Sequence, residues 1–362
     1  MKLSLSIAQQ GNLYPSVYNC LRSLPDCALH HSDHGLRHPI GIYSLSLGRV
    51  VQAFKVVLDE NDKIYQAPTD SNGSCNFETA ALLKAQQELL DALMAHIDDC
   101  YQILKALYPA NRNGARKPAH FAHQWLSQAK HPTVEFFKDQ INPYRETFAP
   151  IDNKMKHEHG RLRSIVMRHP ALLDVPQIRI AGYFVEGVDS HQTLGPDREI
   201  HEGKYAISFH HDLRHHFVHL YTIGHFLVQA LIDVIKIEYL PSFKPEQYVS
   251  VSQSEIEEIK NIAERVASLP FLFYMNEVTK PVPSVNLLAI NEDITLILHE
   301  KLVFKTVTSL RSSTLNPYQI ELQYGGDSVS RSWKLPYMGL QMNITVNRQG
   351  EILEIYVTEK NE

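Results

Sequence analysis

Residues 211–239 read HDLRHHFVHLYTIGHFLVQALIDVIKIEY, and their apolar side chains recur every three or four positions. This spacing places them on one face of a helix with 3.6 residues per turn, so we expect a long helix here. His211, His215 and His219 lie on the opposite face, at successive four-residue steps. The apolar face consists of Leu213, Phe217, Leu220, Gly224, Leu227, Leu231 and Ile235.

The segments around this helix alternate between helical and extended patterns. Apolar residues at helical spacing, bounded by prolines and polar residues, predict four further helices. They are expected at about residues 76–108, 119–129, 143–168 and 254–268.

Extended patterns occur before, between and after these helices. Residues 40–58 and 63–67 alternate and are rich in β-branched side chains, and Asp59-Glu60-Asn61-Asp62 between them is typical of a turn. This pattern predicts a β-hairpin. We also expect strands at about 177–188 and 205–209, and a series of short strands from about residue 285 to the C-terminus.

Together these elements predict an α+β fold. It would consist of an N-terminal β-hairpin, a helical bundle, a central unit of strands and the long helix, and a C-terminal antiparallel β-meander. The expected units are residues 1–75, 76–170, 171–284 and 285–362. A chain of 362 residues is long enough for several such units.

Composition indicates an intracellular globular protein. Four cysteines, with no Cys-x-x-Cys pair, do not form the framework of a small disulfide-rich domain. The N-terminal residues lack the basic and apolar regions of a signal peptide, and the most apolar run, residues 217–237, is interrupted by polar side chains. We therefore expect a cytoplasmic protein that does not contact a membrane.

Charge is distributed unevenly along the chain. The net charge is -5, which argues against a general affinity for duplex nucleic acid. Between Arg112 and His169, however, eleven Lys or Arg residues stand against five Asp or Glu residues, a net charge of about +6. A local basic surface is therefore compatible with the sequence.

The histidine face of the long helix is a candidate metal site. Imidazoles four residues apart can bind one metal, as zinc or another divalent transition metal would require. His211, His215 and His219 are the candidate ligands, and a further ligand would have to come from elsewhere in the chain. Two other interpretations are a polar face packed against a neighbouring domain or subunit, and a pH-sensitive surface.

A second candidate site lies on the helix expected at 143–168. Its apolar face would include Ile151 and Met155, and its polar face would carry Asn153, His157 and Arg161. Such a polar strip is suited to solvent or to a binding partner.

The stretch from Asp152 to Arg161, preceded by two expected helices, resembles the signature helix of the HEPN superfamily of small helical bundles. Active members use an Arg, a following polar residue and a His one turn later to cleave RNA without metal across a homodimer cleft. Asn153 and His157 match the polar residue and the His, whereas Asp152 stands at the Arg position. The resemblance covers residues 76–169.

The resemblance implies an RNA-binding homodimer of the kind found in defence and toxin–antitoxin systems. In a ribonuclease of this type, His157 would be the general acid/base, Asn153 would orient it, and Arg161 would contact the phosphate. Such an enzyme needs no cofactor. A catalytically degenerate relative would bind RNA or a protein partner instead. The alternatives are a metal-dependent enzyme built on the histidine face, and a non-enzymatic interaction protein.

Overall fold

The computed structural model describes the chain in segments, and helices build most of its core. The described residues are 2–7, 17–68, 77–113, 121–129, 131–158, 160–166, 180–188, 194–201, 207–245, 253–269, 286–290, 293–299, 323–325, 328–334, 340–347 and 352–359. The α-helices are α1 (Val17–Arg22), α2 (Pro39–Gln66), α3 (Ala80–Lys105), α4 (Ala122–Ala129), α5 (Pro132–His157), α6 (Arg198–His201), α7 (Phe209–Glu238) and α8 (Gln253–Ser268).

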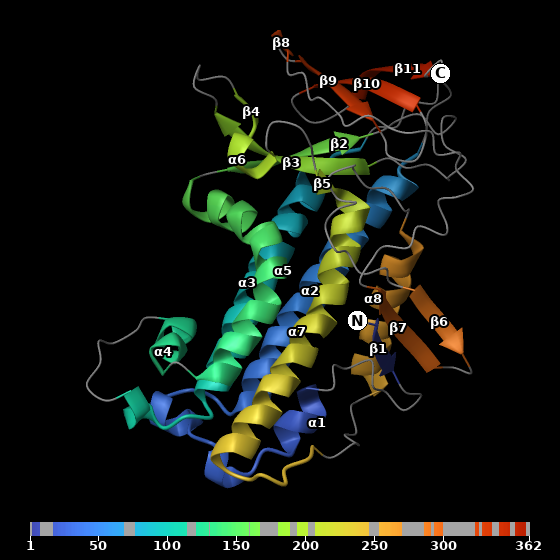
Figure 1. The fold of residues 1–362 in the computed structure, drawn as a ribbon. Coiled ribbons are helices and arrows are strands. Elements are labelled where there is room, and N and C mark those ends of the chain that lie inside the picture. Colours follow the sequence, from blue (N-terminus) through green and yellow to red (C-terminus); the bar gives the residue numbers. More distant parts are fainter. Residues whose placement is uncertain are drawn as a thin grey trace.

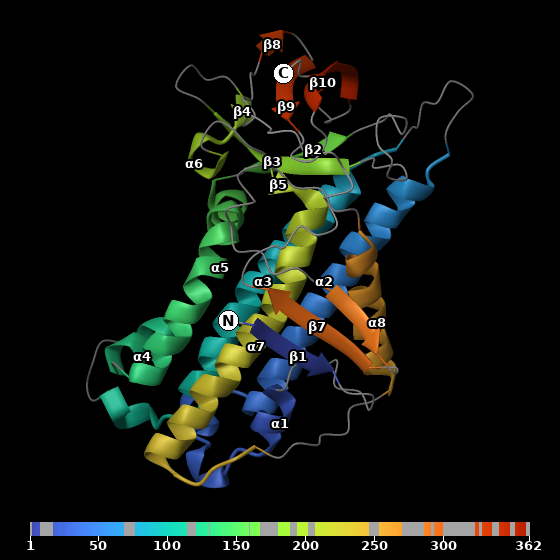
Figure 2. The ribbon, with the colours of Figure 1, turned by 45° about the vertical axis from the view of Figure 1, so that its right-hand side comes forward.

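Four long helices, α2, α3, α5 and α7, run side by side along the molecule (Figure 1). They alternate in direction, and α8 flanks α2 and α7 (Figure 2). One hydrophobic cluster extends through all five helices and includes the fully buried rings of Tyr43, Phe54, Phe137 and Phe148. The bundle therefore contains the main hydrophobic core of the described residues.

The described strands form three antiparallel sheets. The sheet with order β2-β3-β4, in which β5 also pairs with β3, lies across one end of the bundle (Figure 1). The other two sheets have the orders β1-β7-β6 and β11-β10-β9-β8. The strands are β1 (Lys2–Ile7), β2 (Arg161–Val166), β3 (Ile180–Val188), β4 (Leu194–Pro196), β5 (Ile207–Ser208), β6 (Asn286–Ile290), β7 (Asp293–His299), β8 (Gln323–Gly325), β9 (Ser328–Lys334), β10 (Leu340–Asn347) and β11 (Ile352–Glu359).

The predicted fold class is wrong, most clearly in the N-terminal β-hairpin. Residues 39–66 form the single helix α2. Pro39 occupies its first turn, and His38 Nδ1 accepts a hydrogen bond from Ile40 N. Although β-branched residues favour strands, the buried side chains of α2 recur at helical spacing, and burial outweighs this propensity. They include Ile42, Tyr43, Leu47, Val50, Val51, Phe54, Val57, Leu58 and Ile64.

The four polar residues expected to form the hairpin turn lie inside α2. Asp59 and Asp62 are one turn apart and both pair with Arg265 of α8, at 2.8 and 2.7 Å. Asp59 and Asp62 therefore form ion pairs between α2 and α8, at the position where the sequence predicted a turn.

The C-terminal part of the predicted class also needs correction. A separate meander from residue 285 would pair strands only with their neighbours in the chain, but β7 pairs with β1 from the opposite end of the chain, in the register Lys2↔His299 to Ile7↔Ile294. The division into four units remains a prediction.

Helix α5 starts and ends earlier than expected. It begins at Pro132, and Pro143 and Pro150 lie inside it. An interior proline loses one helical hydrogen bond, but the buried face of α5 continues through both, from Val134 to Met155. After His157 the chain turns, and residues predicted to be helical form β2.

Helices α2 and α7 are long and apolar enough to cross a membrane. Within the protein, 44% of the relevant window of α2 and 59% of that of α7 are buried. Core helices of a bundle meet the same criteria of length and composition, so these helices do not decide the location of the protein.

Substitutions at the exposed Gly48 test the helical assignment of residues 39–66. A Cβ atom at Gly48 meets nothing within 4 Å. In a helix, Gly48→Ala should raise the free energy of unfolding by roughly 0.5–1 kcal/mol. The Gly48→Ala variant should also be more stable than the Gly48→Val variant. Urea denaturation measures both. A strand would give the opposite order of Ala and Val.

Gly187→Ala provides a control for close packing. A Cβ atom at position 187 would lie 2.8 Å from Asp197 Cα. The free energy of unfolding of Gly187→Ala should therefore be roughly 1–3 kcal/mol lower than that of the wild-type protein.

Candidate functional site

The histidine face of α7 is packed against α5. His211 and His215 are only 5% and 6% exposed. The ring of Tyr144, from α5, stacks on His219 with centroids 4.2 Å apart and an interplanar angle of 11°. Thr147 Oγ1, one turn further along α5, lies 3.4 Å from His215 Nε2. Two of the three predicted metal ligands, His215 and His219, therefore contact α5, and the third, His211, is buried.

A polar network lies beside these histidines and centres on Asp212. Its Oδ2 atom accepts hydrogen bonds from Tyr183 Oη at 2.7 Å and Gln86 Nε2 at 2.9 Å. His216 Nε2 lies 3.1 Å from the same oxygen. The other ring nitrogen of His216, Nδ1, is 2.9 Å from Tyr144 Oη. The network thus joins α3, α5, α7 and β3.

This environment keeps Asp212 ionised. Burial alone would raise the pKa of Asp212, but the adjacent His216 and the hydrogen bond from Tyr183 outweigh it and hold the pKa below its usual value. A largely buried carboxylate is tolerated when donors meet its charge, and here three groups converge on Oδ2.

Two other histidines are fully buried and uncharged at neutral pH. Burial lowers the pKa of His96 to about 4 and that of His210 to about 3. His96 Nδ1 lies 2.9 Å from Ser46 Oγ, and His210 Nε2 lies 3.2 Å from Tyr65 Oη. Both rings therefore act as neutral hydrogen-bonding groups within the bundle.

A metal site would need at least three suitable side chains close together. Within the described segments, no group of three or more His, Cys, Asp or Glu residues is arranged to hold a metal ion. There, the imidazoles of α7 pack against rings and bind hydroxyl and carboxylate groups.

The second candidate site lies where α5 ends and β2 begins. Asn153 and His157 are exposed on the last turns of α5, and Arg161 is exposed at the start of β2. The expectation that these three share one helix face is wrong for Arg161. The helix ends where Gly160 N, six residues after Lys154, donates to Lys154 O at 3.1 Å, after which the chain continues into β2.

Asp152, which stands at the Arg position of the HEPN-like pattern, points into the protein and is 1% exposed. Its carboxylate is 2.9 Å from Lys156 Nζ, which also reaches Asp91 at 3.2 Å. Burial and the neighbouring Asp91 carboxyl raise the pKa of Asp152 to about 6. The Asp152 carboxylate is therefore paired with Lys156 and lies inside the protein, away from the exposed surface.

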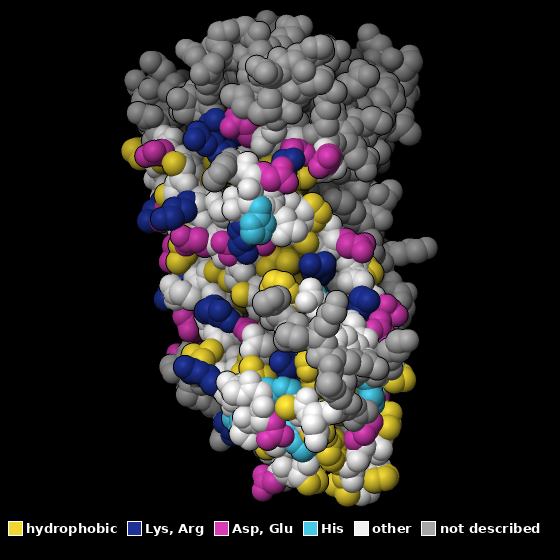
Figure 3. All heavy atoms as spheres, turned by 90° about the vertical axis from the view of Figure 1, so that its left-hand side faces the viewer, with side chains coloured by type: hydrophobic (Ala, Val, Ile, Leu, Met, Phe, Trp, Pro, Cys, Tyr) yellow, Lys and Arg dark blue, Asp and Glu magenta, His cyan; other side chains and the backbone are white. Residues whose placement is uncertain are grey.

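Much of the local basic excess is paired. Lys154 Nζ lies 2.6 Å from Asp197 and 3.1 Å from Glu158. Basic and acidic side chains are interspersed over the face that includes α5 (Figure 3). Arg161 differs, because it forms no ion pair with any residue in the described segments.

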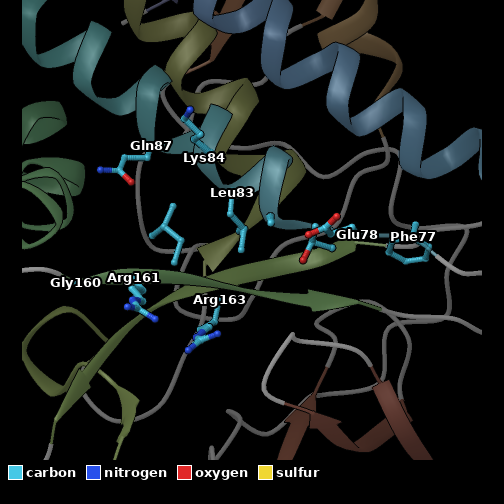
Figure 4. Close-up of a pocket in the computed structure, with 11 residues that line it drawn as sticks. Phe77, Glu78, Leu83, Lys84, Gln87, Gly160, Arg161 and Arg163 are labelled. Atoms are coloured by element: carbon cyan, nitrogen blue, oxygen red, sulfur yellow. The ribbon is translucent and has the colours of Figure 1, made fainter.

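A groove of about 770 Å³ separates the first turns of α3 from β2. We call it the α3–β2 groove. Arg161 and Arg163 line it from β2, and Lys84 and Gln87 line it from α3 (Figure 4). The other lining residues are Phe77, Glu78, Thr79, Ala80, Leu83, Gly160 and Leu162.

Sequence reasoning identified Arg161 but missed the polar residues of α3 that line the same groove. Lys84 and Gln87 lie more than seventy positions earlier in the chain and belong to no motif. They become its neighbours only because β2 folds back across the start of α3. For the Asp212 network, the sequence indicated the histidines and missed Gln86, Tyr144 and Tyr183 for the same reason.

The chain matches no known protein-family model, no curated protein sequence and no solved structure.

Acidification should destabilise the protein through its buried histidines. The pKa of His210 is about 3 in the folded protein and about 6.5 in the unfolded chain, so only the unfolded chain gains a proton between these values. The contribution of neutral His210 to the free energy of unfolding is fully present above pH 6.5. Below pH 6.5 it falls by about 1.4 kcal/mol for each pH unit.

His210→Gln isolates this effect and retains an acceptor for Tyr65. Urea denaturation between pH 4 and 6 should show that the slope of unfolding free energy against pH is about 1.4 kcal/mol per unit smaller in the variant. The raised pKa of Asp152 gives the slope a contribution of the opposite sign. Because both proteins contain Asp152, this contribution does not affect the difference between their slopes. Equal slopes would mean that His210 is not buried in its neutral form.

Proposed function

We propose that this protein binds RNA through the end of α5, the start of β2 and the adjoining α3–β2 groove. The single observation that carries the proposal is the position of Arg161. It is exposed, forms no ion pair within the described segments, and lines the groove four residues after the exposed His157. Arginine is the side chain best suited to phosphate, because its planar guanidinium donates several hydrogen bonds at once.

The inward position of Asp152 supports this proposal. An exposed aspartate beside His157 would repel a phosphate backbone, but Asp152 is 1% exposed and bonded to Lys156. The surface that carries Asn153, His157 and Arg161 is therefore compatible with an anionic ligand.

The same observation favours binding over cleavage. In the HEPN-like pattern, an Arg at position 152 would stabilise the charge that develops on the phosphate. Asp152 cannot do so, and Arg161 lies on a strand beyond the helix. We therefore propose a HEPN-like protein that has kept RNA binding and lost the arginine needed for cleavage. The homodimer implied by the resemblance remains part of this proposal.

Fluorescence anisotropy with a labelled 15-nucleotide single-stranded RNA tests the proposal. Arg161→Ala should weaken binding about tenfold, which is typical of one lost charge-assisted hydrogen bond. The slope of log K against log salt should fall by about 0.7. Lys236→Ala is the control, because it removes an exposed cation from the last turn of α7. It should change neither the RNA affinity nor the salt slope.

Three results would contradict the proposal. If the wild-type protein does not bind RNA, or if Lys236→Ala weakens binding as much as Arg161→Ala, this surface is not an RNA site. If the wild-type protein cleaves RNA and His157→Ala does not, the protein is a ribonuclease, and the proposed loss of cleavage is wrong.

A further inference from the structure

We infer that the free edge of β2 is a docking site for an extended, acidic peptide segment of a partner protein, which adds a strand to the sheet beside α3. This inference goes beyond the proposed RNA binding and does not depend on it. It concerns the backbone of β2, whereas the proposed RNA contact is made by the side chain of Arg161. A peptide on this edge would cover Arg161 and so exclude RNA.

Strand β2 lies at the edge of its sheet. Among the described strands it pairs only with β3, in an antiparallel register that sets Leu162 opposite Val185. Four consecutive residues, Gly160 to Arg163, line the α3–β2 groove. Because neighbouring side chains of a strand point to opposite faces, a run of consecutive residues lines a groove with its backbone edge. The groove therefore follows the edge of β2 that no described strand occupies.

The hydrogen bonds of Val185 show which backbone groups of β2 point into the groove. Val185 O accepts from Asp197 N, and Val185 N donates to His201 Nε2, both at 2.8 Å. Both backbone groups of Val185 thus point away from β2, and Leu162 forms a non-hydrogen-bonded pair with it. The N–H and C=O of Leu162 therefore point to the free edge. No residue in the described segments bonds to them.

The side chains of β2 divide between two faces of the sheet. Leu162 and Ser164 face the bundle, because Leu162 is 8% exposed and Ser164 Oγ is 2.8 Å from Thr79 Oγ1. Arg161 and Arg163 alternate with them, so both guanidinium groups lie on the outer face of the sheet, away from α3 (Figure 4). An added strand would continue both faces.

On the face toward α3, the added strand would present apolar side chains. The half-buried side chains of Leu83 and Phe77 line this part of the groove, together with Leu162 of β2. The volume of about 770 Å³ is within the range of pockets that hold drug-sized ligands. The peptide residue opposite Leu162 would point here and exchange two backbone hydrogen bonds with it. A β-branched apolar residue fits this position.

On the outer face, the added strand would lie beside Arg161 and Arg163. In antiparallel pairing with the peptide these two positions are non-hydrogen-bonded, with Cα atoms about 4.5 Å apart and side chains closest. Arg163 is bonded to Glu186 at 3.0 Å, whereas Arg161 forms no ion pair with any described residue. Opposite charges at such positions stabilise a strand pair. Acidic residues of the peptide therefore match them.

A second copy of β2 fits the same edge less well. Antiparallel pairing of two β2 strands about Leu162 would bring Arg161 of each copy opposite an arginine of the other, and like charges at opposite positions are destabilising. Charged side chains on an edge strand also prevent it from pairing with copies of itself. The partner is therefore a different segment, in which acidic and β-branched apolar residues alternate.

A fluorescein-labelled peptide, Gly-Glu-Val-Glu-Val-Glu-Gly, tests the inference by anisotropy with the whole chain. When its valines face α3, their N–H groups point to β2, and those of the glutamates point away. Methylation of both valine nitrogens removes the donor to Leu162 O and should weaken binding roughly 3- to 10-fold for each lost hydrogen bond. Methylation of two glutamate nitrogens is the matched control and should leave binding unchanged.

An exchange of charge tests the outer face. The wild-type protein should prefer this peptide to one with lysine in place of each glutamate. Arg161→Glu should reduce that preference roughly tenfold, because it replaces a favourable pair by an unfavourable one. Lys236→Glu makes the same change at an exposed position in the last turn of α7 and should leave the preference as in the wild-type protein. Thermal melting establishes that both variants are folded.

Several results would overturn the inference. They are equal losses on methylation of valine and of glutamate, no binding up to about 1 mM peptide, and equal effects of Arg161→Glu and Lys236→Glu. Equal affinity for Gly-Glu-Glu-Glu-Val-Val-Gly, which has the same charge without the alternation, would also overturn it. RNA binding without peptide binding leaves the proposed function intact, whereas peptide binding without RNA binding removes the proposed function alone.

Discussion

The described bundle depends on how it accommodates one carboxylate, that of Asp212. A charge among apolar helices is costly unless hydrogen bonds replace the lost water. Here Gln86 and Tyr183 supply hydrogen bonds, and His216 Nε2 lies 3.1 Å from the same oxygen. The other ring nitrogen of His216 is 2.9 Å from Tyr144 Oη. Because each partner comes from a different element or turn, satisfying this carboxylate fixes α3, α5, α7 and β3 relative to one another.

This constraint also shapes the surface on which the proposed function rests. Tyr183 belongs to β3, and β3 pairs with β2 in the register Arg161↔Glu186 to Ser164↔Tyr183. Ser164 Oγ is 2.8 Å from Thr79 Oγ1, just before α3. The buried network and this contact together hold β2 over the start of α3, and the space left between them is the α3–β2 groove.

Much of the helical framework could be predicted from the sequence, because burial imposes a simple spacing. The expected long helix at 211–239 corresponds to α7, and those at 76–108 and 254–268 correspond to α3 and α8. Helix α2 was missed because its β-branched residues also fit a strand, and only packing against α3 and α8 decides between the two. The end of α5 was missed because the apolar pattern continues into β2, whereas the local signal for the turn is Gly160, whose N–H donates to Lys154 O.

The candidate sites were less predictable, since a site consists of residues that the fold brings together. Histidines at four-residue spacing indicated that the α7 face was special but could not distinguish metal binding from packing, which depends on Tyr144 and Thr147 of α5. In the same way, Arg161 was identified with the wrong neighbours. Lys84 and Gln87, which line the same groove, carry no sequence signal of their own.

The most direct test of the central claim is photochemical cross-linking of a single-stranded RNA that contains 4-thiouridine, followed by mass spectrometry of the attached peptides. RNA binding in the α3–β2 groove predicts cross-links within residues 77–87 and 160–163. Cross-links confined to other segments, such as α4 or the C-terminal end of α7, would contradict it.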